Sequence, residues 1–159
     1  QKMTTHQLVM LVWSLVGLSV FIYLFFQTAP YGRHQENGWG FEISSRWGWI
    51  LMESPAFYLM LIFLILNFSN SSNFSIFAAI LFMIHYFNRS FIWPIRARIK
   101  NKSMPVTIAL SAFLFNFVNV YIQGTWLFYI SDYATSHFYS VPFFLGLSLF
   151  FIGMSINIK

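Results

Sequence analysis

The stretch WGWILMESPAFYLMLIFLIL, residues 47–66, is apolar from end to end except for one charged residue, Glu53. As an α-helix rising about 1.5 Å per residue, a stretch of this length crosses a hydrocarbon core of about 30 Å. Four more continuous apolar runs cover residues 8–26, 74–95, 106–130 and 141–158. None of them shows the alternation of barrel strands. The sequence therefore predicts an all-α, polytopic transmembrane helix bundle of about five spans.

The composition agrees with a membrane protein. The 159 residues are 58% hydrophobic and only 8% charged, whereas soluble domains average about 25% charged residues. The chain holds no cysteine, which excludes disulfides and zinc–thiolate sites within it, and we expect no metal. The formal charge of +5 comes without any nucleic-acid-binding motif, so we expect no nucleic-acid partner. With neither repeat nor linker, residues 1–159 are expected to form a single transmembrane domain.

Apart from Lys2 before the first run and Arg89 within the third, the positive charges lie in alternate connections between the runs or at the end of the sequence. They are Arg33 and Arg46 in the first connection, Arg96, Arg98, Lys100 and Lys102 in the third, and Lys159 at the end. The second and fourth connections hold no Lys or Arg. The positive-inside rule then places the N-terminus outside or in the lumen, and the first and third connections in the cytoplasm. We expect an integral, multi-pass protein of a bacterial inner membrane or of the endoplasmic reticulum.

Glu53 and Tyr86 are the first candidates for a site inside the membrane. A charged carboxylate there costs about 2.5–3.5 kcal/mol on insertion scales, so Glu53 must be protonated, partnered or facing a polar cavity. Glu53 lies about 9 Å into its run and Tyr86 about 13 Å from the same side, at 1.5 Å per residue. Arg89 lies one turn nearer the cytoplasm. Two donors at one level suit a carbonyl oxygen that gains negative charge.

Each of these residues also has a structural interpretation. Glu53 can make a polar contact between helices, Arg89 can extend toward the interface, and Tyr86 can be an interfacial aromatic residue. The basic residues 96–102 can mark topology, bind a phosphate group or contact anionic lipid. Asn116, Asn119 and Gln123 recur at spacings of three and four, and their shared face must turn inward, because lipid cannot satisfy amides.

Several stretches resemble the steroid 5α-reductases, in the order that this family has them. They are Tyr31-Gly32-Arg33-His34, Glu53-Ser54-Pro55, His85-Tyr86-Phe87-Asn88-Arg89-Ser90-Phe91, Gln123-Gly124 and Gly153-Met154-Ser155-Ile156-Asn157-Ile158. The resemblance implies a membrane reductase that uses NADPH to reduce the C4–C5 double bond of 3-oxo-Δ4-steroids taken from the bilayer. Hydride would go to C5 and a proton to C4.

The resemblance also implies site residues. Glu53 and Tyr86 would be catalytic and polarise the 3-keto group. The steroid-binding positions fall on Tyr31, Trp49 and Phe115, and the cofactor-binding positions on Arg89, Arg98 and Asn157. The family has about seven spans. The chain therefore resembles the N-terminal part of such an enzyme and is expected to need the C-terminal part.

Two other functions fit the same residues. A related enoyl or polyprenol reductase would need an elongated groove instead of a flat slot for a steroid. A non-enzymatic lipid-binding or transport protein would use Glu53 and Arg89 as a buried ion pair. Such a protein would show no dependence of its stability on NADPH.

Overall fold

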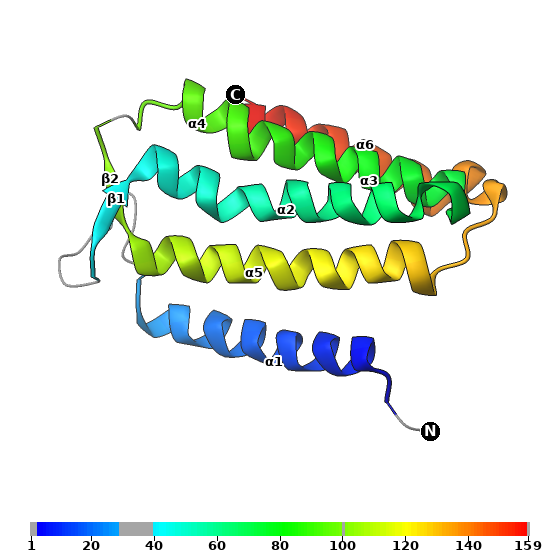
Figure 1. Cartoon of the computed structure of the whole chain (residues 1–159), viewed down its shortest axis with the longest axis horizontal. Helices are drawn as coiled ribbons and strands as arrows, with labels where there is room; N and C mark the ends of the chain where they lie inside the picture. The colour runs from blue at the N-terminus through cyan, green and yellow to red at the C-terminus, as the bar shows by residue number, and fades with distance from the viewer. Residues whose placement is uncertain (1–2, 29–39, 100, 159) are drawn as a thin grey trace.

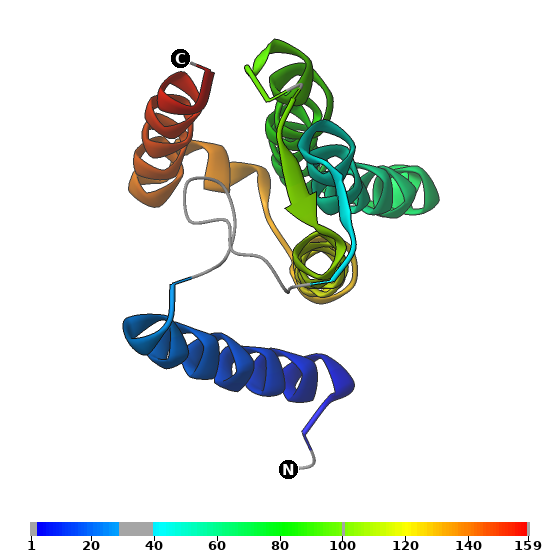
Figure 2. The ribbon, with the colours of Figure 1, turned by 90° about the vertical axis from the view of Figure 1, so that its left-hand side faces the viewer.

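The computed structural model describes residues 3–28, 40–99 and 101–158, and most of them are helical. Five apolar helices are long enough to cross a membrane, and in Figure 1 they extend along the long axis of the molecule. The end view in Figure 2 shows that the first of them is inclined to the others. These spans are Thr5–Phe26, Ser45–Asn70, Asn73–Arg96, Val106–Ile130 and Val141–Ile158. Their ends lie within a few residues of the predicted runs. The predicted five-span helical bundle is therefore confirmed, and the chain is an integral membrane protein.

Each span is built from one or more helical elements. The first, second and fifth begin with α1 (Thr5–Phe26), α2 (Ser45–Asn67) and α6 (Val141–Ile158). The third consists of α3 (Asn73–Phe87), the π-helical η3 (Asn88–Ile92) and α4 (Trp93–Arg96). The fourth consists of α5 (Val106–Thr125) and the π-helical η4 (Trp126–Ile130). Short 3-10 turns, η2 (Phe68–Asn70) and η5 (Thr135–Tyr139), lie at the second and fourth connections.

The core lies where α2 packs between α5 and α3. The buried side chains there are small or flexible: Ala56, Met60 and Leu64 of α2, Ala79 of α3 and Val120 of α5. A methyl group on Gly124 of α5 would lie 2.6 Å from the Phe63 ring, so the two helices approach closely at this glycine. Close approach through small residues is how membrane helices gain packing energy, because lipid supplies no hydrophobic drive between them.

The outer spans pack more loosely than α2, α3 and α5. Figure 2 shows α1 set apart from the other helices, with α5 as its nearest neighbour. The Trp13 ring of α1 lies 5.8 Å from the Phe115 ring of α5, and His6 contacts the Ile122 carbonyl oxygen at 3.1 Å. The end view also shows α6 beside α3 on the far side of the bundle.

A two-stranded ribbon joins the first and third connections. Strand β1 (Glu42–Ser44) pairs antiparallel with β2 (Ser103–Pro105), so that Ile43 lies opposite Met104. The all-α prediction did not include this ribbon. Next to it, the Arg46 guanidinium donates to the carbonyl oxygens of Pro94 at 3.0 Å and Ile95 at 3.5 Å. The start of α2 is thereby tied to the end of α4, and the basic connections meet at one end of the bundle.

Candidate active site

Glu53 lies in the third turn of α2 and is only 4% exposed. One carboxylate oxygen accepts a hydrogen bond from Arg89 Nε at 2.7 Å, and the other accepts one from Asn116 Nδ2 at 3.3 Å. Glu53 was expected to be protonated, partnered or facing a polar cavity, and the structure shows it partnered by Arg89 and Asn116. This ion pair is also the contact that a non-enzymatic lipid-binding protein was expected to use.

Tyr86 reaches the same region from the last turn of α3. Its hydroxyl donates to Asn116 Oδ1 at 3.4 Å, and the Asn119 side chain also interacts with it. Among the described residues no hydrogen bond joins Tyr86 directly to Glu53. The amide of Asn116 stands between them, so the phenol and the carboxylate expected at one depth are linked through a residue of α5.

Arg89 lies in η3, where the helix widens to a π turn. Such turns shift the register of the residues that follow and are frequent at functional sites. The guanidinium carbon lies 5.3 Å from the centre of the Trp49 ring, and the side chain is 37% exposed. Trp49 in turn packs against Trp93 with ring centroids 4.6 Å apart. The Arg89 cation is thus held between a carboxylate and an aromatic face.

Two small adjoining recesses of about 140 and 120 Å³ open beside Arg89. Both are lined by Asn88, Trp93 and Asn157, one also by Arg89 and the other by Arg96. Guanidinium and amide groups of this kind suit a phosphate or a carboxamide. Pockets that enclose a whole ligand measure roughly 300–1,000 Å³. Each recess is therefore large enough for one such group and too small for a whole ligand.

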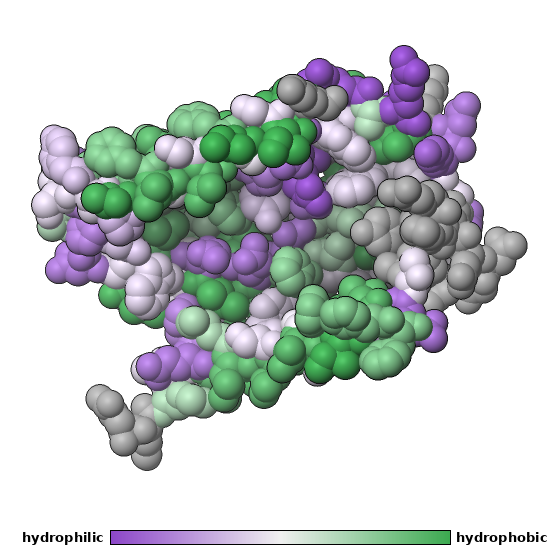
Figure 3. Space-filling view, turned by 180° about the vertical axis from the view of Figure 1, so that it is seen from behind, coloured by the Kyte–Doolittle hydropathy of each residue, from purple (hydrophilic) through white to green (hydrophobic). Residues whose placement is uncertain are grey.

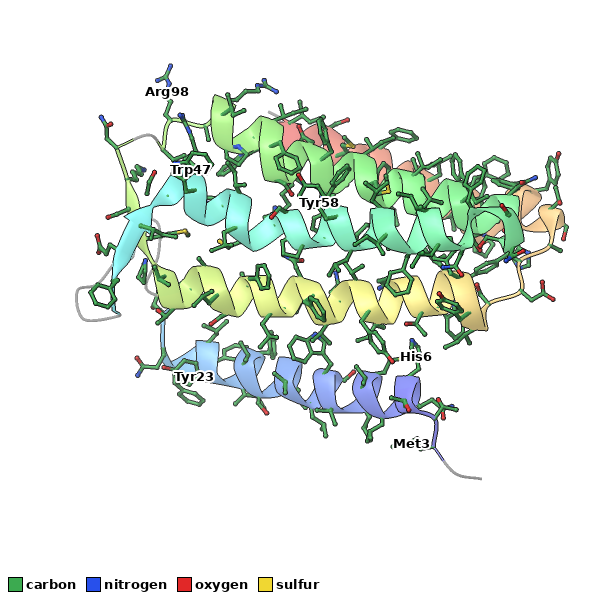
Figure 4. The ribbon with its side chains drawn as sticks, viewed as in Figure 1. Met3, His6, Tyr23, Trp47, Tyr58 and Arg98 are labelled. Atoms are coloured by element: carbon green, nitrogen blue, oxygen red, sulfur yellow. The ribbon has the colours of Figure 1, made fainter. Side chains whose placement is uncertain are left out.

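The other predicted site residues lie farther from Glu53 or outside the description. Phe115 is adjacent to Asn116 on α5, but the residue is 52% exposed and its ring packs against Trp13 of α1. Arg98 lies beyond the end of α4 and points away from the bundle (Figure 4). Tyr31 lies outside the described residues.

A long apolar groove of about 640 Å³ runs between α3 and α6. Phe74 and Phe143 line one end, while Tyr86 and Asn157 line the other. The twelve residues from Phe74 to Tyr86 correspond to about 18 Å of helix. In Figure 3 hydrophilic side chains form a band across the middle of one face, between two hydrophobic edges. Tyr86, which lines the groove and also contacts Asn116, therefore links the buried polar cluster to this apolar groove.

Comparison with known proteins agrees with the resemblance seen in the sequence. Residues 102–159 match the family model described as 3-oxo-5-alpha-steroid 4-dehydrogenase. The chain is 38% identical to steroid 5-alpha-reductase DET2 of Gossypium hirsutum over 152 residues, 91% of this chain and 58% of the relative. The chain is therefore similar to steroid 5α-reductases along about nine tenths of its own length.

Further steroid 5α-reductases match with similar coverage. The DET2 protein of Arabidopsis thaliana is 37% identical over 86% of this chain and 55% of its own length. The 3-oxo-5-alpha-steroid 4-dehydrogenase 1 of Bos taurus is 30% identical over 90% of this chain and 57% of its own length. The chain thus spans somewhat more than half the length of these relatives.

Asn116 is the residue of this cluster that sequence reasoning did not assign to the site. Its spacing from Asn119 and Gln123 placed it on an inward face of α5. The structure bears this out for Asn116, which is 4% exposed, but Asn119 is only half-buried and Gln123 is exposed. The spacing carried no information about which groups on α2 and α3 it would meet. Arg46 is a similar case, because a basic residue in a connection gave no sign that it would bind the end of α4.

Proposed function

We propose that this chain forms the carbonyl-recognising part of a membrane reductase that reduces the C4–C5 double bond of 3-oxo-Δ4-steroids with NADPH. The observation that carries the proposal is the cluster of Tyr86, Glu53 and Arg89, joined through Asn116, inside the spans of a steroid 5α-reductase homologue. Residues 1–159 would form one transmembrane domain that needs the C-terminal part of the enzyme for activity.

A bound reduced nicotinamide would supply hydride, which in this reaction goes to C5 while a proton goes to C4. Hydride addition to C5 leaves the negative charge of an enolate on the 3-oxygen until C4 takes up the proton. The Tyr86 hydroxyl suits this oxygen as a hydrogen-bond donor, because the bond it makes to Asn116 is long, at 3.4 Å, and easily exchanged. A donor aimed at a developing oxyanion in a dry site stabilises the transition state far more than it would in water.

Glu53 polarises the same group indirectly in this proposal. A carboxylate that accepts from Arg89 and Asn116 has no proton to donate to a ketone. Its charge instead fixes the Arg89 guanidinium one helical turn from Tyr86, where the cation lowers the energy of the enolate oxygen. A direct bond from Glu53 to the ketone would require a protonated carboxyl released from Arg89.

The remaining roles rest on the family resemblance and on the recess beside Arg89. Arg89 and Asn157 would hold one part of the cofactor, and Trp49, which shares that recess, would lie near the steroid. Arg98 as a cofactor residue, and Phe115 and Tyr31 as steroid residues, have family resemblance as their support.

The test uses the full-length protein, purified and incubated with NADPH and either progesterone or testosterone. We expect NADPH oxidation and a 5α-reduced product. Tyr86→Phe should lower kcat/KM by about 100-fold or more, the loss typical for one oxyanion donor. Glu53→Gln should lower kcat/KM to a similar degree. The glutamine amide can donate a hydrogen bond to the ketone, but it carries no charge to hold Arg89 in place. Full activity in both variants would refute the assigned roles.

Two observations favour other functions, which the same experiments can test. The long apolar groove between α3 and α6 favours an extended isoprenoid or acyl substrate, so polyprenol and enoyl substrates belong in the activity panel. The buried ion pair favours a lipid-binding protein without cofactor. A rise in melting temperature with NADPH would count against the latter, since a ligand that binds the folded state stabilises it by mass action.

A further inference from the structure

Asn116 occupies the centre of the polar cluster and makes three side-chain hydrogen bonds there. Its Nδ2 donates to the Met52 carbonyl oxygen at 2.8 Å and to Glu53 Oε2 at 3.3 Å. Its Oδ1 accepts from the Tyr86 hydroxyl at 3.4 Å. The side chain is 4% exposed, so water does not substitute for these partners. One amide thus connects the backbone of α2, the carboxylate and the phenol.

The chemistry of the partners fixes which way the amide points. A main-chain carbonyl and a carboxylate can only accept, so the NH₂ group of Asn116 must face Met52 and Glu53. The carbonyl end is thereby left to Tyr86, whose hydroxyl must act as donor. The proton of Tyr86 is therefore aimed along a defined line before any ligand arrives.

We infer that Asn116 is a positioning residue: it fixes the Tyr86 hydroxyl and the Glu53 carboxylate relative to each other, in the places where they act on the substrate carbonyl. This inference rests on the proposed function. The bond to Met52 is the shortest of the three and anchors the amide to the helix backbone. The bond to Tyr86 is the longest, so a ketone oxygen can replace Asn116 as the acceptor at little cost.

Asn116→Leu in the full-length enzyme tests the inference, because leucine keeps the branching at Cγ and removes all three bonds. We expect kcat to fall by about 10- to 100-fold with KM changed by less than about threefold. Asn67→Leu is the matched control, since Asn67 also donates to a main-chain carbonyl, that of Phe63 at 2.8 Å, and to a tyrosine hydroxyl, that of Tyr129 at 3.1 Å. It should leave kcat within about twofold.

Two further variants separate positioning from folding. Asn116→Gln keeps both donors and the acceptor but moves them by one methylene, so it should restore the melting temperature and still lower kcat. If Asn116→Gln restored both the melting temperature and kcat, Asn116 would be merely structural and the inference would be overturned. In Asn116→Leu/Tyr86→Phe the losses should not add, because Asn116 acts through Tyr86. Multiplicative losses would also overturn it.

A readout that needs no turnover tests the bond itself. The infrared difference spectrum between wild type and Tyr86→Phe isolates the Tyr86 phenol, whose C–O band responds to hydrogen bonding. Asn116→Leu should shift this band, and Asn67→Leu should not. If Asn116→Leu shifts the band but the wild-type protein reduces no enone, the proposed function is refuted and the Asn116–Tyr86 bond is supported. An unshifted band in an active enzyme would refute the inference alone.

Discussion

Glu53 and Arg89 form a pair whose two members experience different environments. The Glu53 side chain is 6% exposed and the Arg89 side chain 37%, with 2.7 Å between Oε1 and Nε. Desolvation offsets much of the attraction in such pairs, so the pair as a whole adds little to stability. Loss of Arg89 alone should lower the free energy of unfolding, because the Glu53 carboxylate would then be buried with Asn116 as its remaining described partner.

This asymmetry predicts the stability of single and double variants. Arg89→Leu should lower the free energy of unfolding by about 2–3 kcal/mol, somewhat less than for a fully buried pair because the arginine is partly exposed. Glu53→Gln/Arg89→Leu should recover at least half of this loss, since no buried charge remains. Thermal or denaturant unfolding in detergent measures both. A double variant as unstable as the sum of the single ones would contradict the role of the pair.

Among the helices, α2 and α5 approach each other closely at Gly124. Any side chain there meets the Phe63 ring, with the first added carbon 2.6 Å from Cδ2 and 2.8 Å from Cε2. The Phe63 ring also stacks on Phe128 of η4, with centroids 6.3 Å apart, which limits its movement. The glycine therefore sets the distance between the two helices that carry Glu53 and Asn116.

Gly124→Ala should destabilise the protein by about 1–3 kcal/mol through overpacking, although alanine favours a helix. Gly17→Ala in α1 is the control, because nothing lies within 4 Å of its added methyl group. That variant should be neutral or slightly stabilising. Melting temperatures in the same detergent compare the two. Equal effects of both substitutions would show that α2 and α5 do not pack through Gly124.

On the scale of the whole molecule, the described basic residues of the first and third connections lie at one end of the bundle: Arg46, Arg96, Arg98 and Lys102. The pairing of β1 with β2 holds the first and third connections together there, and Arg46 binds the end of α4 beside them. Exposed Trp47 and Arg98 lie at this end as well (Figure 4). Aromatic and basic residues in this arrangement are typical of a cytoplasmic membrane interface.

The chain contains no cysteine, which makes this orientation directly testable. Single-cysteine variants Ser69→Cys in the second connection and Asn101→Cys in the third would be treated with a membrane-impermeant maleimide. In right-side-out vesicles Ser69→Cys should react, and Asn101→Cys should react only after permeabilisation. The opposite pattern would reverse the proposed topology and place Arg89 on the outer side.

The sequence by itself determined the five spans, because hydropathy reports the solvation of each residue and needs no knowledge of its neighbours. It also identified Glu53, Tyr86 and Arg89, since ionisable and polar groups are costly in lipid wherever the chain goes. The family resemblance followed from motif order and was confirmed by the matches to steroid 5α-reductases.

Only the tertiary structure decided how these groups are paired. The sequence placed Tyr86 and Glu53 at one depth, yet Glu53 binds Arg89, and Asn116 of α5 lies between the two. Such contacts depend on the rotation of three helices and on the π turn at Asn88–Ile92, which hydropathy does not encode. The ribbon of β1 and β2 was missed for the same reason: each strand has three residues and is stabilised by the other.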